Sequence, residues 1–340
     1  MTRQRRRIVS GTRPTGRLHL GHLHGALRNW IRLQNEAAEC FFFVADWHAL
    51  TTGWQNTSGI RVSTRDMVLD WLAAGLDAAR VVLFVQSAVK AHAELHLLLS
   101  MIVPTPWLLR NPTIKEQARE LGLLSGDDDS AMSQLNYGML GYPVLQAADI
   151  LVYRATGVPV GIDQVPHLEM TREVARRFNH VYETVFPEPE ALLTESPKIP
   201  GTDGRKMSKS YNNAVYLFES DADITTKLSR MATDPRRVRR TDPGDPNDCP
   251  AFNLHRIYCT PDEIALVREG CRTAGIGCLD CKKIMIKHVL ADIAPIRERR
   301  AALDQTPGVV DDVLHAGNAR AQAAAEETMA RVREVMHLSP

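Results

Sequence analysis

Residues 7–30 constrain the fold of this chain more than any other stretch, and they run RIVSGTRPTGRLHLGHLHGALRNW. The apolar start at Ile8 and Val9, with Ser10, is typical of the end of a buried strand. Residues 11–16 are predicted as a turn because glycine and proline punctuate them. Leucine and isoleucine then recur at helical spacing, at Leu20, Leu23, Leu27 and Ile31. A strand therefore passes through a turn into a helix over residues 20–34.

Two histidines, His19 and His22, lie at the predicted start of this helix, with Gly21 between them. A helix N-terminus gathers free N–H groups and a partial positive charge, so it can bind an anion. Gly21 has no side chain and lets a ligand approach the backbone. A phosphate chain at this place would meet two imidazoles as well as the helix end. The alternative is a pair of surface histidines, because HLGH alone is a weak pattern.

A second motif, KMSKS, occupies residues 206–210. Lys206 and Lys209 are spaced i and i+3, and they follow a glycine-containing segment at residues 200–205. Two lysines on a mobile loop can close over a polyphosphate and neutralise charge as it leaves. KMSKS alone would also suit a solvated surface loop, but HxGH near the N-terminus together with KMSKS past mid-chain is a specific combination.

This pair of motifs resembles the two signatures of class I aminoacyl-tRNA synthetases. Three further stretches narrow the resemblance to the bacterial tryptophanyl-tRNA synthetase family: YPVLQAADIL at 142–151, VPVGIDQ at 158–164 and HLEMTR at 167–172. The resemblance covers nearly the whole chain. It implies ATP with Mg²⁺ as cofactor, L-tryptophan and tRNA(Trp) as partners, and a homodimer.

Buried strands alternate with helices in the first part of the chain. The apolar runs at 40–45 and 81–85 are predicted strands, and residues 58–74 and 142–154 are predicted helices, the first with Ser58 as a possible cap and Gly75 as its stop. Strands without polar alternation favour a parallel sheet covered by helices on both faces. The prediction is an α/β protein, with ligands beyond the carboxyl ends of the strands.

The domain organisation follows from this pattern and the resemblance. We expect a Rossmann-like catalytic domain over 1–218, with an insertion at about 104–160, joined by a C-terminal helix at 297–340. An all-helical anticodon-binding domain is expected over 219–296, since the periodicity becomes helical beyond Lys209. The chain of 340 residues is long enough for two domains.

Composition limits the surface and the compartment. The formal net charge is +1, from 41 basic and 40 acidic residues, so a nucleic-acid surface must be a local basic patch. The basic run after Pro235 offers candidate tRNA phosphate contacts at Arg236, Arg237, Arg239 and Arg240, although such runs are usually solvated faces. No stretch suits a membrane span or a signal peptide, so a cytoplasmic protein without membrane contact is expected. Disulfides among its six cysteines are not expected.

The resemblance also implies a set of site residues. For catalysis these are His19, His22, Lys206, Lys209 and Lys115. For ATP they are Arg13, Pro14, Thr15, Gly21, His22, Gly161, Ile162, Asp163, Gln164, Lys206, Met207, Ser208, Lys209 and Ser210. For tryptophan they are Val9, Gly11, His48, Tyr142, Gln146, Asp149, Val158, Val160 and Gln164. Four positions depart from the common family pattern and leave their side-chain roles open: Arg13, His22, Gln146 and Ile162.

Asp149 is the unexpected member of an apolar helix face, flanked by Ala148 and Ile150. A buried carboxylate is costly unless it is paired. It could be an ordinary helix-surface aspartate. The resemblance instead implies that it accepts the indole N–H of tryptophan, which is the one polar group of that ring.

Four cysteines, Cys249, Cys271, Cys278 and Cys281, follow the pattern C-x21-C-x6-C-x2-C. The last two form a CxxC that can bind one metal centre. The resemblance to the iron–sulfur variety of these synthetases implies a [4Fe–4S] cluster, and a zinc ion on the same four thiolates is the main alternative. Cys40 and Cys259 are expected to be spare thiols.

The chain is thus expected to be a tryptophan–tRNA ligase. It would activate tryptophan with ATP, release pyrophosphate, and transfer tryptophan to tRNA(Trp). The first rival is a tyrosyl-tRNA synthetase, which shares both signatures. The second is a non-ligating tRNA-binding paralogue.

Overall fold

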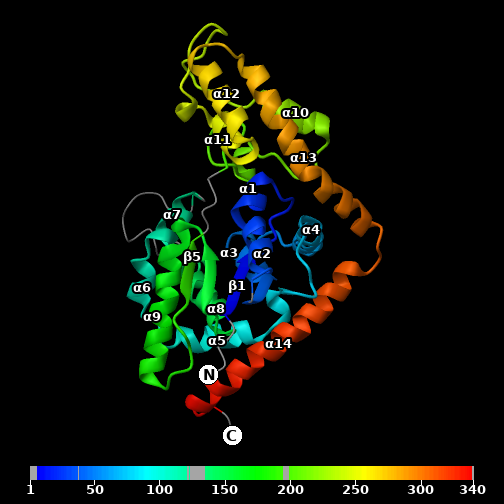
Figure 1. Ribbon diagram of the computed structural model, residues 1–340. Helices are drawn as coiled ribbons and strands as arrows, with labels where there is room; N and C mark the ends of the chain where they lie inside the picture. Colours follow the sequence, from blue (N-terminus) through cyan, green and yellow to red (C-terminus); the bar gives the residue numbers. More distant parts are fainter. Residues whose placement is uncertain (1–5, 37, 121, 123–134, 194–198, 339–340) are drawn as a thin grey trace.

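The computed structural model describes residues 6–36, 38–120, 122, 135–193 and 199–338 (Figure 1). Its centre is a five-stranded sheet in the order β3-β2-β1-β4-β5, and all of its pairings are parallel. The strands are β1 (Arg6–Thr12), β2 (Ala38–Val44), β3 (Val82–Val85), β4 (Gly157–Val160) and β5 (Glu190–Leu193). This arrangement confirms the predicted α/β fold with a Rossmann-like parallel sheet.

Both faces of the sheet are buried, which explains why its strands lack polar alternation. Successive residues of a strand point to opposite faces. On β2, Phe42 stacks on Trp30 of one apolar core with ring centroids 4.4 Å apart, and Phe41 stacks on Tyr153 of the other at 4.6 Å. Each face of the sheet therefore needs apolar side chains, and consecutive phenylalanines in one strand supply them to the two faces in turn.

Helices follow each strand and cover the sheet. The first helical segments are α1 (Leu20–His22), a π-helical turn η1 (Leu23–Leu27), α2 (Arg28–Leu33), α3 (Asp46–Gly53), α4 (Ile60–Ala74), α5 (Ala91–Ser100), α6 (Thr105–Leu109), α7 (Pro112–Glu120), α8 (Tyr137–Leu151) and α9 (Val165–Val181). Beyond the sheet come α10 (Asp221–Ser229), α11 (Pro250–Tyr258), α12 (Pro261–Arg272), α13 (Cys278–Asp304) and α14 (Val309–Val335). Among the described helices, none combines the length and the apolar character that a membrane crossing requires.

Predicted boundaries of three elements, β1, α4 and α8, were wrong, each for a local reason. Strand β1 continues through Gly11, predicted as turn, because Gly11 pairs with Phe43 of β2. Helix α4 begins at Ile60, because the hydroxyl of Ser58 donates to Asn56 instead of capping the helix.

Helix α8 differs from the prediction at both ends. It begins at Tyr137, where the side chain of Asn136 accepts from the N–H of Met139 at 2.8 Å. It ends at Leu151, three residues before Arg154, whose φ of 50° is left-handed and incompatible with a helix.

Helices α10, α11, α12 and the first part of α13 lie together at one end of the molecule (Figure 1). Helix α13 then runs back to the sheet domain, where Arg300 pairs with Asp66 and Asp70 of α4. Helix α14 packs closely on the edge strand β3. The approach requires glycine at position 317, since a Cβ there would lie 1.7 Å from the carbonyl oxygen of Leu83. Asn318 also accepts the N–H of Val85 at 3.0 Å. The predicted single C-terminal helix from residue 297 is instead divided between the end of α13 and α14, and α14 is the part that packs on the sheet.

Candidate active site

The strand order places a crevice at the carboxyl ends of β1 and β4. The chain runs outward from β1 through β2 to β3, and then returns to the other side of β1 with β4. Such a switch point opens a ligand crevice beyond the strands. A cavity of about 360 Å³ lies there, within the range of small-molecule sites. Its lining includes all nine residues predicted to bind tryptophan: Val9, Gly11, His48, Tyr142, Gln146, Asp149, Val158, Val160 and Gln164.

Asp149 is 2 % exposed, yet it lines the cavity, and three hydrogen bonds from other side chains hold its carboxylate. Its Oδ1 accepts from the Gln86 side-chain amide at 2.8 Å and from Nδ1 of His92 at 2.6 Å. Its Oδ2 accepts from Nε2 of His48 at 2.8 Å. Burial alone would raise the pKa of Asp149, but the bonds from His48 and His92 bring it down to about 2. The carboxylate is therefore charged at neutral pH, and Oδ2 keeps one lone pair for a ligand donor.

The partners of Asp149 are themselves fixed. The N–H of Trp47 donates to the side-chain amide oxygen Oε1 of Gln86 at 3.1 Å, and Nε2 of His92 contacts the Tyr153 hydroxyl at 2.8 Å. Because a carboxylate only accepts, Nδ1 of His92 carries the proton and Nε2 accepts from Tyr153. Gln86 and His92 are both fully buried, and sequence analysis missed them. Gln86 directly follows the buried strand β3, and a polar residue at that place is the signal that could have indicated it.

Tyr142 stands beside the tryptophan-binding candidates on α8. Its hydroxyl is 2.9 Å from Nε2 of His167, and its ring meets that of His48 edge-on with centroids 6.4 Å apart. Burial raises the pKa of Tyr142 above its ordinary value, so its hydroxyl stays protonated. These contacts hold an aromatic wall on the cavity.

His19 and His22 lie at the start of the helical run that follows β1, as predicted. Nδ1 of His19 accepts the N–H of Gly21 at 3.1 Å, and Nδ1 of His22 accepts the N–H of His19 at 3.2 Å. The two rings are 3.8 Å apart. Burial, then Lys209, lowers the pKa of His19 to about 4, and burial also lowers that of His22. Both rings are therefore neutral, and because Nδ1 accepts, each carries its proton on Nε2 as a donor for a ligand.

The structure gives a different reason for glycine at position 21 from the close approach of a ligand that the sequence suggested. A Cβ there would lie 2.8 Å from the His19 ring, so glycine makes room for that imidazole to fold over the helix start. The glycine is required by a side chain of the motif itself, whether or not a ligand approaches its backbone.

Lys209, which is 194 residues from Thr15 in sequence, reaches the turn beside the two histidines. Its Nζ donates to the Thr15 carbonyl at 2.9 Å, on the turn after β1. Burial lowers the pKa of Lys209 to about 8. Its charge acts on His19 and His22 and lowers the pKa of each. The HLGH and KMSKS motifs therefore lie side by side in the structure, as expected for two motifs that act on one ligand.

The KMSKS segment is anchored by residues that sequence analysis did not single out. The segment after it pairs with the start of the helical run, with the N–H of Leu20 on the Val215 carbonyl at 3.0 Å. Asn213 is 1 % exposed, accepts from the N–H of Ser208 at 2.8 Å and donates to Asp203 at 2.7 Å. Met207 is buried against this support. No periodicity or motif could have indicated Asn213.

The remaining candidates are spread around this centre. Arg13, Gly161 and Gln164 line the cavity, whereas Pro14, Thr15, Met207, Ser208, Ser210 and Lys206 do not. Ile162 is 75 % exposed, and the side chain of Asp163 lies outside the part of the chain that is described. Lys115 lies half-buried on α7 and is not part of the cavity lining, although Gln117 of the same helix is.

The four predicted metal cysteines come together between α11, α12 and α13. Cys249 precedes α11, Cys271 lies on α12, and Cys278 and Cys281 open α13. All four line one small cavity together with Arg237 and Lys282. Burial, then the charges of the other cysteines, raises the pKa of Cys281 to about 12. Among the described residues, no three of these four sulfurs lie within 4.8 Å of one another.

The arginine run divides in two. Arg236 pairs with Asp234 and Asp248, and Arg237 donates to the Ile276 carbonyl at 3.0 Å beside the cysteines. Arg239 and Arg240 are exposed. Arg236 is exposed as well, but both of its carboxylate partners are on the protein, so Arg239 and Arg240 are the better candidates to present charge to a ligand.

Comparison with known proteins agrees with this geometry. The profile of the family described as tRNA synthetases class I (W and Y) matches residues 1–290. The tryptophan–tRNA ligase of Thermotoga maritima is 52 % identical, over 98 % of this chain and 99 % of that protein. That of Aquifex aeolicus is 44 % identical, over 98 % of this chain and 100 % of that protein.

A solved structure shares the fold over the same extent. Tryptophanyl-tRNA synthetase from Campylobacter jejuni, complexed with ADP and tryptophan, superposes with a TM-score of 0.83 at 30 % identity. The match covers 97 % of this chain and 99 % of that one.

Proposed function

The chain belongs to the class I tRNA synthetases for tryptophan and tyrosine, within the tryptophan–tRNA ligases, and from this premise we propose how its residues divide the work. The cavity beyond β1 and β4 holds tryptophan, with the indole N–H on Oδ2 of Asp149. The single observation that carries this proposal is a charged, buried carboxylate that lines a cavity of suitable size and accepts only three hydrogen bonds from the protein groups described.

ATP lies across the turn after β1, between the cavity and the HLGH histidines. The tryptophan carboxylate attacks the α-phosphorus, a bond forms between that oxygen and phosphorus, and the bond to the bridging oxygen of pyrophosphate breaks. No covalent enzyme intermediate is needed, so catalysis consists of positioning and charge stabilisation. The Nε2–H groups of His19 and His22 and the ammonium of Lys209 are the donors. Mg²⁺ arrives on the phosphates of ATP as part of the substrate. Lys206 and Lys115 are further candidate phosphate contacts.

The second step passes tryptophan to the terminal adenosine of tRNA(Trp). We assign anticodon binding to the helical part over 219–296 and catalysis to 1–218 with 297–340. The exposed pair Arg239 and Arg240 supports this division, because a tRNA surface needs local positive charge on a chain of net charge +1.

The test is aminoacylation by the purified chain. With ATP, Mg²⁺ and a tRNA(Trp) transcript, tryptophan should become attached to the tRNA, and omission of ATP should abolish the attachment. A folded preparation that forms no tryptophanyl-tRNA under these conditions would contradict the proposal.

For the four cysteines we propose a [4Fe–4S] cluster. Four thiolates that line one cavity can bind either a zinc ion or an iron–sulfur cluster. The C-x21-C-x6-C-x2-C pattern, which resembles that of the iron–sulfur variety of these synthetases, favours the cluster. Arg237 and Lys282 border the same cavity and offset the negative charge of four thiolates. Adenylate formation involves no electron transfer, so the cluster would be structural and would join α11, α12 and α13.

Metal analysis distinguishes cluster from zinc. Anaerobically purified protein should be brown, with about four iron and four sulfide per chain if the site is full. One zinc per chain without sulfide would reject the cluster and favour the zinc alternative.

Two chains associate as a homodimer in this proposal, on the strength of the family resemblance. Light scattering on the eluting protein tests it. A mass near twice 37.9 kDa is expected, and a single-chain mass at working concentration would contradict it.

A further inference from the structure

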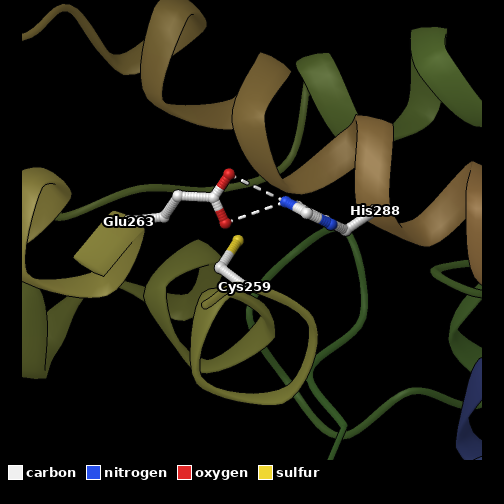
Figure 2. A group of neighbouring side chains, drawn as sticks. All are labelled: Cys259, Glu263 and His288. Carbon is white, nitrogen blue, oxygen red and sulfur yellow. Dashed lines mark hydrogen bonds and ion pairs between the residues drawn. The ribbon is translucent and has the colours of Figure 1, made fainter. Parts of the chain in front are cut away.

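A second group of metal-binding side chains lies outside the four-cysteine cavity. Cys259 directly follows α11, Glu263 lies in the first turn of α12, and His288 comes from α13. One ligand atom from each lies within 4.8 Å of the others, and among the described residues this is the one such group (Figure 2). Figure 2 shows the imidazole facing the carboxylate, with the sulfur of Cys259 directed to the same point. Three helices therefore present a thiol, a carboxylate and an imidazole to one place.

From this geometry we infer that Cys259, Glu263 and His288 form a site for a divalent transition metal of the zinc class. Thiolate, imidazole and carboxylate are the three ligand types of protein zinc. Three protein ligands leave a fourth position, which water can fill. His288 and Glu263 keep side-chain exposures of 27 % and 29 %, so an ion can enter from solvent.

The carboxylate ligand is already oriented by contacts that a bound ion would not disrupt. Glu263 accepts from the N–H and hydroxyl of Thr260, at 2.9 and 3.1 Å, through Oε2. Nε2 of His288 lies 2.9 Å from Oε1 of the same carboxylate, and a bound ion would replace this hydrogen bond by bridging the two groups. Thr260 is the single residue between Cys259 and α12, so this capping arrangement also fixes the thiol beside the carboxylate. Such second contacts orient metal ligands.

The site is separate from the four-cysteine cavity but adjacent to it. Cys259 does not line that cavity. The ring of His255, which is fully buried, lies between the two, with Nδ1 3.2 Å from the sulfur of Cys259 and Nε2 3.1 Å from that of Cys281. A bound ion would tie the α11–α12 turn to α13, and α13 reaches the catalytic domain through Arg300. Its effect should therefore fall on the helical part and its tRNA surface.

The experiment uses the full chain purified anaerobically with its four-cysteine site filled, washed with a mild chelator and titrated with Zn²⁺ alone. Calorimetry should show one further zinc per chain. Cys259→Ser and His288→Gln should each weaken this binding at least about tenfold. His315→Gln is the matched control, an exposed histidine on α14, and should leave it unchanged. Circular dichroism checks that each variant is folded.

A second measurement needs no variant. Alkylation of the wild-type protein, mapped by mass spectrometry, should slow at Cys259 at least about tenfold when Zn²⁺ is added, because a metal-bound thiolate is not free to react. Absence of a further zinc, an unchanged alkylation rate at Cys259, or loss of binding in only one of the two ligand variants would overturn the three-ligand site.

Discussion

Replacement of Asp149 tests how this protein recognises tryptophan. The carboxylate offers four lone pairs, and Gln86, His92 and His48 use three of them, at 2.8, 2.6 and 2.8 Å. In the proposed complex, the indole N–H of tryptophan takes the fourth, on Oδ2. In Asp149→Asn, one oxygen becomes an NH₂ group. With that group at the Oδ2 position it meets two donors, His48 and the indole; with it at the Oδ1 position it meets Gln86 and His92.

The cost can be estimated from this count. Hydrogen bonds to a charged acceptor contribute about 1.5–3 kcal/mol and neutral ones about 0.5–1.5 kcal/mol, so loss of the charge alone removes about 1 kcal/mol from tryptophan binding. Asp149→Asn should therefore weaken tryptophan by about 1–2 kcal/mol, roughly 5- to 30-fold. Asp149→Ala removes the acceptor entirely and should cost about 2–4 kcal/mol. The alanine variant also leaves three buried donors without their acceptor, so its free energy of unfolding should fall by about 3 kcal/mol.

Calorimetry with tryptophan and with an analogue in which sulfur replaces the indole N–H separates recognition from stability. Wild-type protein should bind the analogue more weakly than tryptophan by about 2–4 kcal/mol. Asp149→Ala should bind the two ligands almost equally, because neither finds the acceptor. The reasoning is refuted if wild-type protein binds the analogue as tightly as tryptophan, or if the alanine variant keeps the full preference for the N–H.

Three further predictions concern the lysine motif and the cysteines. Lys209→Ala should slow adenylate formation in a single turnover by at least about a hundredfold and change tryptophan affinity little, because its ammonium acts on transition-state charge; an unchanged rate would remove this role. Burial lowers the pKa of Lys209 to about 8, so the free enzyme loses this charge as pH rises through 8, and kcat/KM for ATP should fall there. Lys209→Arg should shift that limb to higher pH, and an identical limb in the variant would assign it to another group. Cys281→Ser should reduce tRNA charging or thermal stability more than pyrophosphate exchange, and an equal loss of both activities in folded protein would place the cysteine site in the adenylation step.

Much of the fold followed from the sequence because the sheet is buried on both faces. Such strands must be continuous apolar runs, and β2 and β3 were predicted within two residues of their ends. The helix end at Gly75 was also predicted, since its φ of 117° requires glycine. The helix starts that were predicted wrongly depend on local hydrogen bonds. The hydroxyl of Ser58 donates to Asn56 and does not cap α4, and the side chain of Asn136 caps the start of α8.

The residues of the candidate site that belong to a sequence motif were predictable. The buried residues that hold them in position were not. HLGH and KMSKS are recognisable in sequence, and so is Asp149 as a carboxylate on an apolar face. The groups that hold them come from distant segments: Gln86 and His92 fix Asp149, and Asn213 fixes the KMSKS segment. Their side-chain types are ordinary, and only the three-dimensional contacts give them a role. Cys259 illustrates the converse, since it was expected to be a spare thiol but lies beside Glu263 and His288.

The most direct test of the account is ATP–pyrophosphate exchange with tryptophan and with tyrosine as the amino acid. Rapid exchange that requires tryptophan is expected, with tyrosine at the background rate, because the proposed role of Asp149 is to accept the indole N–H. Equally rapid exchange with tyrosine would contradict both the proposed role of Asp149 and the choice of tryptophan as the substrate. Absence of exchange with either amino acid, in folded protein with ATP and Mg²⁺, would contradict the claim that HLGH and KMSKS form a working adenylation site.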